Sequence, residues 1–273
     1  MTTLAAALVA ARLILPAFEA RLLLGFVLGR NGAWIEAHRD DALDEGPARQ
    51  FAALAARRAS GEPIAYLTGR REFYGREFDV APAVLIPRPE TELLVEVALG
   101  KVSRGETARI LDLGAGSGCV AVTLALELPA ASVTAVDVSA DALVVARKNV
   151  GRLGAKVTFA QSDWFSAVDG EFDVIVTNPP YLAEGDPHLA QGDLRFEPAG
   201  ALASGPAGLA ALRTIVAEAP RRLASGGWLF FEHGYDQAAA VRELLAVAGF
   251  EDIEQHRDLA GIVRVSGGRR PRP

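Results

Sequence analysis

The residues with the clearest capacity for chemistry lie in TNPPY, at 177–181, where an apolar, strand-like run ends. Two consecutive prolines, Pro179 and Pro180, fix φ and stiffen the turn. A stiff turn can hold the side-chain oxygen of Asn178 and the carbonyl of Pro179 as hydrogen-bond acceptors, while the ring of Tyr181 can pack on a planar group. Acceptors that bind both N–H groups of an amide or an aromatic amine can turn its delocalised lone pair toward an electrophile. The motif therefore predicts a reaction at a planar nitrogen, in which positioning and preorganised dipoles supply the rate.

A glycine-rich turn upstream supplies a candidate ligand site. In LDLGAGSG, an apolar run leads into the turn and a helix-period stretch follows. The turn consists of Gly114, Ala115, Gly116, Ser117 and Gly118. The glycines remove side chains where the backbone approaches a ligand, and the following helix presents free N–H groups. The spacing GxGxG and the missing P-loop lysine point away from a pyrophosphate or triphosphate ligand.

Acidic and aromatic residues follow the next two apolar runs. Asp137 ends the second run, where a carboxylate can bind two ribose hydroxyls, and Ser139 is free to cap the helix expected from Ala140. Asp163 and Trp164 follow the third run, where an aspartate could accept from an adenine amino group and an indole could cover the ring. Alternatively, Asp163 caps a helix and Trp164 belongs to the core.

The elements that would position these residues alternate along the chain after Ala108. Apolar, strand-like runs occupy 109–114, 132–138, 156–161, 172–180, 228–234, 251–258 and 262–267. Helix-period stretches occupy 119–128, 140–154, 208–223 and 237–249. This alternation predicts an α/β, Rossmann-like domain with a mainly parallel sheet, helices on both faces and a C-terminal antiparallel hairpin. The candidate residues would then share the carboxyl edge of the sheet, where open α/β sheets bind ligands.

The first part of the chain has a different organisation. Apolar residues at helical spacing, interrupted by Gly and Pro, predict three or four short helices and a small helical domain over 1–60. A linker over 61–88 follows, with a hairpin around Gly75, and Pro89 can open a helix in the catalytic domain at 89–273.

Composition limits the classes of function. A net charge of −6 and a pI near 5.4 oppose tight non-specific binding of nucleic acid. Arg269, Arg270 and Arg272 form a basic tail that we expect to be a frayed, solvated terminus. The single cysteine, Cys119, cannot form an intramolecular disulfide and is expected to be a small buried hydrophobe. At the start of the chain, MTTLAAALVAARLILP, the longest uncharged apolar run is far short of the roughly 18 residues of a membrane span, so we expect neither an anchor nor a signal peptide, and a cytoplasmic protein.

Together these motifs resemble the release factor glutamine methyltransferases, also called the PrmC or HemK family. The resemblance covers nearly the whole chain and includes GEPIAYLTG, REFYG, LIPRPETE, LDLGAGSG, SDWF, NPPY and DPHLAQGDLRFEP. It implies an S-adenosylmethionine enzyme that releases S-adenosylhomocysteine and methylates N5 of the glutamine in the Gly-Gly-Gln motif of class 1 peptide chain release factors. It also implies a helical N-terminal domain that helps to grip the release factor, and we expect a monomer.

The resemblance assigns roles by position. The residues implied to bind the cofactor are Gly114 to Gly118, Asp137, Asp163, Trp164 and Asn178. The residues implied to hold the glutamine are Asn178, Pro179, Pro180 and Tyr181, bordered by Arg88 and Glu90. Two departures from the family pattern, Arg21 for an acidic residue and Val263 for a polar one, concern partner docking more than chemistry.

Two other classes of function remain. Adenine-N6 methyltransferases use the same type of motif, but they must extrude a base and hold a phosphate backbone, and this acidic chain shows no cationic surface or target-recognition domain. A methyltransferase-like scaffold would be favoured by loss of an acceptor or a cofactor ligand, yet Asn178 and Asp137 are both present. We expect no metal, and we expect His233 to make a structural hydrogen bond rather than to act as a general base.

Overall fold

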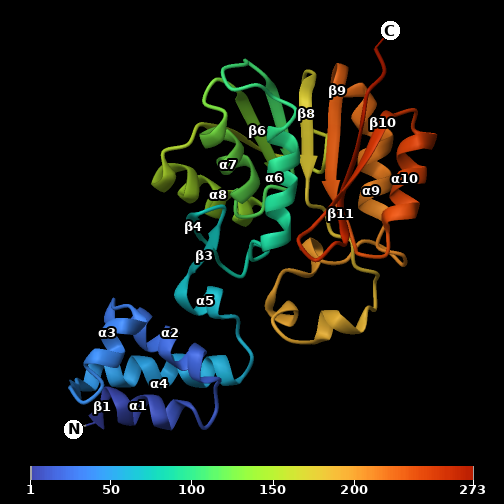
Figure 1. Ribbon diagram of the computed structural model, residues 1–273. Coiled ribbons are helices and arrows are strands. Elements are labelled where there is room, and N and C mark those ends of the chain that lie inside the picture. Colours follow the sequence, from blue (N-terminus) through green and yellow to red (C-terminus); the bar gives the residue numbers. More distant parts are fainter. Residues whose placement is uncertain (1, 273) are drawn as a thin grey trace. The chain divides into compact units, whose positions relative to one another are not determined.

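The computed structural model describes residues 2–272 and divides the chain into two compact units (Figure 1). The first unit contains the chain up to Arg70 together with Gln191–Phe196. The second contains Arg71–Ala190 and the chain from Glu197 onward.

The first unit is helical. Its helices are α1 (Leu4–Ala11), α2 (Ala17–Leu28), α3 (Gly32–Ala37), α4 (Glu45–Ala59) and α5 (Ile64–Thr68), and its two short strands are β1 (Thr2–Thr3) and β2 (Ala42–Leu43). Local capping begins two of the helices, because the side chain of Thr3 accepts from the N–H of Ala6 and that of Asn31 accepts from Trp34. Leucines from α1, α2 and α4 form the core together with Ile35 and Phe51.

A segment from the second half of the chain packs into this helical unit. Asp193 accepts a hydrogen bond from Arg58 at 3.1 Å, and Arg58 also bonds the carboxylate of Glu19 at 2.9 and 3.0 Å. Arg195 donates to the carbonyl of Ser60. The loop that follows TNPPY therefore belongs in part to the helical unit, which the linear pattern did not indicate.

The second unit is built on a seven-stranded sheet in the order β10-β11-β9-β8-β5-β6-β7. Its strands are β5 (Arg109–Leu113), β6 (Ser132–Asp137), β7 (Val157–Gln161), β8 (Phe172–Thr177), β9 (Leu223–Glu232), β10 (Glu251–Arg257) and β11 (Val263–Arg269). Strands β5 to β9 are mutually parallel, whereas β11 runs antiparallel to both β9 and β10. The Rossmann-like, mainly parallel sheet with an antiparallel C-terminal hairpin is thus confirmed.

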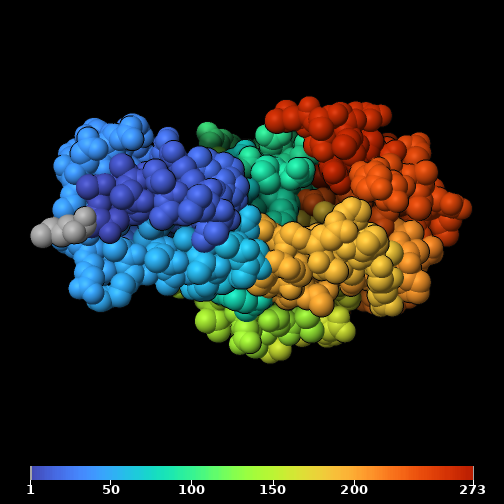
Figure 2. Space-filling view, turned by 90° about the horizontal axis from the view of Figure 1, so that it is seen from below, coloured from blue at the N-terminus to red at the C-terminus, as the bar shows by residue number. Residues whose placement is uncertain are grey.

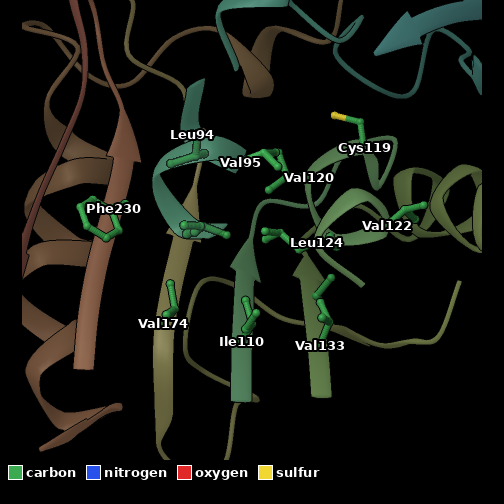
Figure 3. Packing of buried hydrophobic residues seen from close by; sticks show 14 of the residues in the cluster. Leu94, Val95, Ile110, Cys119, Val120, Val122, Leu124, Val133, Val174 and Phe230 are labelled. Atoms are coloured by element: carbon green, nitrogen blue, oxygen red, sulfur yellow. The ribbon is translucent and has the colours of Figure 1, made fainter. Parts of the chain in front are cut away.

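Helices cover both faces of this sheet. They are α6 (Glu92–Leu99), α7 (Cys119–Glu127), α8 (Ala140–Leu153), α9 (Ala210–Glu218) and α10 (Ala238–Val247). Side chains of α6 and α7 pack with Ile110, Val133 and Val174 on one face, as Figure 3 shows. Side chains of α9 and α10 pack on the other face, because alternate residues of each strand point to opposite sides.

Short elements complete the second unit. A two-stranded sheet, β3 (Arg70–Phe73) and β4 (Arg76–Asp79), turns at Tyr74 and Gly75, and Phe73 and Phe78 belong to the same core cluster as the buried residues of α6. The 3-10 helices of this unit are η1 (Pro89–Thr91), η2 (Pro187–Ala190), η4 (Ala199–Ala201) and η5 (Ala219–Arg221), whereas η3 (Leu194–Phe196) belongs to the first unit. The chain between β8 and α9, in gold tones, lies at the surface in Figure 2.

Two expectations are corrected. Strand β9 begins at Leu223, five residues before the run at 228–234, because Leu223 already pairs with Phe172 of β8. The basic tail is not frayed at Arg269 and Arg270. Arg269 ends β11 and contacts Asp252 at 2.7 Å, and Arg270 contacts Glu171 at 3.1 Å, because β11 pairs with both β10 and β9 and so is held at its end.

Within residues 2–272, no helix is both long enough and apolar enough to cross a membrane.

Candidate active site

The predicted site residues meet in the second unit, at the carboxyl ends of four parallel strands. Gly114 follows β5, Asp137 ends β6, Asp163 follows β7 and Asn178 follows β8. These strand ends surround a cavity of about 250 Å³. The linker segment before α6 and the chain around η4 complete its wall.

The cavity wall includes most of the predicted residues. They are Arg88, Gly114, Ala115, Gly116, Ser117, Asp137, Asp163, Trp164, Asn178, Pro179 and Pro180. Within the described chain, three predicted residues do not line it: Gly118, Tyr181 and Glu90. Gly118, the last residue of the turn, packs on Ala146 of α8, and Glu90 is exposed to solvent in η1. The hydroxyl of Tyr181 instead bonds the buried Glu232.

The glycine turn is anchored to β6 by its backbone and depends on glycine for its conformation. The N–H groups of Gly114 and Ala115 both donate to the carbonyl of Val136 at 2.9 Å. Gly114, Gly116 and Gly118 have φ values of 76°, 54° and 80°, a left-handed conformation that side chains disfavour. Glycine is therefore required here by the backbone itself.

A buried asparagine that the sequence did not single out also supports this turn. The amide of Asn149, in α8, donates to the carbonyls of Ser117 and Asp79 at 2.9 Å, and its oxygen accepts from the N–H of Asp79 at 2.7 Å. The end of the β3–β4 hairpin, α8 and the glycine turn are thereby joined. Only helix periodicity, which puts Asn149 on the buried face of α8, could have indicated it.

Asp137 contacts the turn rather than capping the next helix. One carboxylate oxygen accepts from the N–H of Gly116 at 2.8 Å and the other from Ser139 at 2.9 Å. Ser139 itself caps α8 by accepting from Ala142 at 3.1 Å, as expected. Because each carboxylate oxygen has a further lone pair, Asp137 can accept two more hydrogen bonds from a ligand in the cavity.

Asp163 and Trp164 lie on a turn that Ser162 organises. The hydroxyl of Ser162 donates to the carbonyl of Trp164 at 2.8 Å and accepts from Ala167 at 2.9 Å. Trp164 has a φ of 47°, which is uncommon for a bulky residue and typical of strained functional positions. In the described chain no helix begins directly after Asp163, so the capping alternative is not supported. Trp164 packs partly on the core and partly lines the cavity.

A chain of hydrogen bonds lies behind Asn178. The Asn178 amide donates from Nδ2 to the Thr91 hydroxyl at 3.1 Å, and Thr91 donates to Glu232 at 2.6 Å. The hydroxyl of Tyr181 donates to the other oxygen of Glu232 at 3.1 Å. The carbonyl of Tyr181 accepts from Gln237 at 3.0 Å, which fixes the turn from a second side.

Burial changes the proton affinities of this hydrogen-bond chain. It raises the pKa of Glu232, and the hydrogen bonds from Thr91 and Tyr181 oppose that rise. Burial also raises the pKa of Tyr181, with the charge of Glu232 adding to the effect, so the phenol stays protonated and continues to donate. Thr91 lies in the quoted motif LIPRPETE, but neither Thr91 nor Glu232 was predicted to be a functional residue.

Arg88 is held by a buried partner on the loop after β8. Its guanidinium pairs with the carboxylate of Glu197, whose side chain is fully buried, and Glu197 also accepts from the N–H of Ile86 at 2.9 Å. This contact ties the linker before α6 to the chain that enters η4, and both segments line the cavity. Glu197 lies in the quoted motif DPHLAQGDLRFEP, yet its pairing with Arg88 was not predicted.

Three other titratable groups of this unit are buried, and two of them, Asp112 and Cys119, line the cavity. Burial raises the pKa of Asp112 to about 7 and that of Cys119 to about 12, so the Cys119 thiol is not a nucleophile. His233 is fully buried, with Nδ1 at 2.9 Å from the carbonyl of Gly234 and Nε2 at 2.8 Å from the hydroxyl of Ser266. Burial lowers the pKa of His233, and its two bonds are structural, as the sequence predicts.

Comparison with known families and folds agrees with this architecture. Residues 2–69 match the PrmC N-terminal domain and residues 89–200 match the Methyltransferase small domain. The methyltransferase RsmC of T. thermophilus, solved with AdoMet and guanosine, has the same fold, with a TM-score of 0.54 and 23% identity over 74% of this chain and 49% of that chain.

The curated relatives are much more similar. The release factor glutamine methyltransferase of Burkholderia pseudomallei (strain K96243) is 54% identical over 94% of this chain and 93% of its own length. That of Escherichia coli (strain K12) is 46% identical over 93% of this chain and 92% of its own. At such identity over nearly the full length of both partners, the chain is a methyltransferase and belongs to the family of release factor glutamine methyltransferases.

Proposed function

We propose that this enzyme transfers a methyl group from S-adenosylmethionine to the side-chain N5 of the glutamine in the Gly-Gly-Gln motif of class 1 peptide chain release factors. The observation that carries the proposal is that Asn178 lines the same cavity as the glycine turn and Asp137. A nitrogen held by Asn178 would therefore share one enclosed space with the ligand of the glycine turn.

The cavity residues fit the proposed cofactor. Ser117 lines the cavity and is buried, and its hydroxyl has no oxygen or nitrogen partner among residues 2–272, so a polar group of a ligand could satisfy it. The spare lone pairs of Asp137 suit two ribose hydroxyls, and Trp164 offers an aromatic face. Bound S-adenosylmethionine supplies an electrophilic methyl group on a sulfonium centre.

The chain's own contribution is to orient the amide. An amide nitrogen is a poor nucleophile because its lone pair is delocalised. We infer that the Asn178 oxygen and the Pro179 carbonyl accept the two N–H groups of the glutamine and turn the lone pair toward the cofactor pocket. No general base is needed, since the amide proton can leave to solvent after transfer, and the buried His233 is committed to structural bonds.

The helical unit is proposed to bind a part of the release factor other than the segment that carries the Gly-Gly-Gln motif. Phe18, Leu22 and Phe26 of α2 are exposed, at four-residue spacing, and so form one apolar row on that helix. A row of this kind is suited to contact with a protein partner. Because release factors act in translation, the proposed place of action is the cytoplasm, with the enzyme as a monomer.

The decisive experiment incubates the full-length enzyme with a recombinant class 1 release factor and isotope-labelled S-adenosylmethionine, followed by mass spectrometry of the peptides. We expect one added methyl group on the glutamine of Gly-Gly-Gln. A release factor in which this glutamine is replaced by alanine serves as the matched control and should remain unlabelled. Label on another residue, or on neither protein, would refute the proposal.

A further inference from the structure

The hydrogen-bond chain behind Asn178 has a direction. The two oxygens of Glu232 accept, one from Thr91 and one from Tyr181. A threonine hydroxyl has a single hydrogen, so once Thr91 donates to Glu232 it can only accept from any other partner. The group that Asn178 presents to Thr91 must then be its NH₂ group, in agreement with the 3.1 Å contact from Nδ2.

This direction decides which end of the Asn178 amide is free. With Nδ2 bound to Thr91, the carbonyl oxygen Oδ1 is the end available to the cavity that Asn178 lines. In the opposite orientation, the NH₂ group of Asn178 would face the NH₂ group of the substrate glutamine. Two donors cannot form a hydrogen bond with each other, so the glutamine N–H would have no acceptor there. Geometry alone does not separate the two orientations, because the oxygen and nitrogen of an asparagine amide have nearly the same shape.

We propose that Thr91 and Glu232 are positioning residues that lock the Asn178 amide with its oxygen toward the substrate nitrogen. This inference rests on the proposed function and adds two residues that lie outside both TNPPY and the glycine turn in the sequence. Their burial makes the lock effective. Thr91 is 3% exposed and Glu232 is 1% exposed, so water does not compete readily for these bonds.

Replacement of Thr91 by valine tests the lock, because valine has a similar shape without the hydroxyl. In Thr91→Val, the Asn178 amide loses the acceptor that selects its orientation, and we expect kcat to fall by roughly tenfold or more. Thr91→Ser keeps the hydroxyl and should retain nearly full kcat. Thr91→Ala is a second variant without the hydroxyl, and all assays are run below the unfolding midpoint of the least stable variant.

The matched control is Thr123→Val in α7 of the same unit. Thr123 is fully buried, but its hydroxyl has no hydrogen-bond partner within residues 2–272. The same chemical change there should leave kcat unchanged. A loss in Thr123→Val as large as that in Thr91→Val would mean that burial of valine, rather than the lock, causes the effect.

A binding measurement separates positioning from general damage. We expect Thr91→Val to weaken binding of the intact release factor, but not binding of the release factor whose Gly-Gly-Gln glutamine is alanine. Calorimetric titration of both proteins into wild type and variant measures this difference without turnover. Equal weakening of both partners would contradict a role directed at the glutamine.

A double-mutant cycle identifies the residue through which Thr91 acts. If Thr91 works only by orienting Asn178, then Thr91→Val has no further effect on single-turnover rates in an Asn178→Ala background. Additive losses would show that Thr91 contacts the substrate by itself and would overturn the proposal, as would wild-type kcat in Thr91→Val. Failure of the wild-type enzyme to methylate the release factor would instead refute the proposed function.

Discussion

At the scale of single residues, Asn178 is the side chain whose removal should separate catalysis from cofactor binding. Asn178→Ala removes a preorganised acceptor for the reacting amide, and we expect turnover to fall at least about tenfold. Affinity for S-adenosylmethionine should change less, because the glycine turn and Asp137 remain intact. Steady-state kinetics and calorimetric titration of the cofactor measure the two effects, and wild-type turnover would refute the role of Asn178.

Asp137 should show the reverse pattern. Asp137→Ala removes the carboxylate that accepts from Gly116 and Ser139, and with it the acceptors available to a ribose. We expect the Kd for S-adenosylmethionine to rise roughly tenfold or more, since hydrogen bonds to a charged group are worth about 1.5–3 kcal/mol. Asp141→Ala is the matched control, because Asp141 is an exposed carboxylate in the first turn of α8. Equal losses in the two variants would contradict a specific role for Asp137.

At the scale of elements, the approach of α8 to the glycine turn depends on Gly118. A Cβ at this position would lie 3.1 Å from the Cβ of Ala146, and the backbone has a φ of 80°. At Gly154, the C-cap of α8, φ is 71° but nothing lies within 4 Å of an added Cβ. Both alanine variants should lose about 1–2 kcal/mol of stability from the left-handed conformation, and Gly118→Ala should lose more because of the contact.

Urea unfolding of the two variants measures this difference in the free energy of unfolding. If Gly118→Ala and Gly154→Ala are equally destabilised, the contact between the turn and α8 is looser than the distance to Ala146 implies.

At the scale of the whole molecule, the buried Asp112 should make stability depend on pH. Its pKa is raised by burial from 3.8 to about 7, so the folded state binds a proton more tightly than the unfolded state does. Asp112 therefore contributes most to stability below its unfolded pKa, and this contribution is lost as the pH rises through about 7.

Asp112→Asn removes this titration while keeping an oxygen that can accept from the N–H of Ala121. We expect the free energy of unfolding of the variant, minus that of the wild type, to increase from about pH 5 to about pH 8, with a slope of at most about 1.4 kcal/mol per pH unit. Denaturant unfolding across this range measures the difference. The other titrating groups are the same in both proteins, so their contributions to the free energy of unfolding cancel. A difference independent of pH would contradict the raised pKa.

The whole molecule also shows where linear patterns stop being informative. The loop between β8 and α9 sends Gln191–Phe196 into the helical unit and then returns through Glu197 to the cavity wall. Nothing in its composition indicates this path, because the ion pair of Asp193 with Arg58 joins residues far apart in the chain. The position of β11 between β9 and β10 was likewise not specified by the hairpin that the sequence predicts.

What the sequence by itself determined is local. The glycines must adopt positive φ, Ser139 must cap a helix that starts beside it, and apolar alternation must produce strands whose carboxyl ends carry Asp137, Asp163 and Asn178. Each of these follows from the chemistry of neighbouring residues. Only the tertiary structure decided the partners of Asn178 and Arg88. Thr91 and Glu232 meet at Asn178, and Glu197 meets Arg88, through contacts between segments far apart in the chain, and chain spacing does not encode these distances.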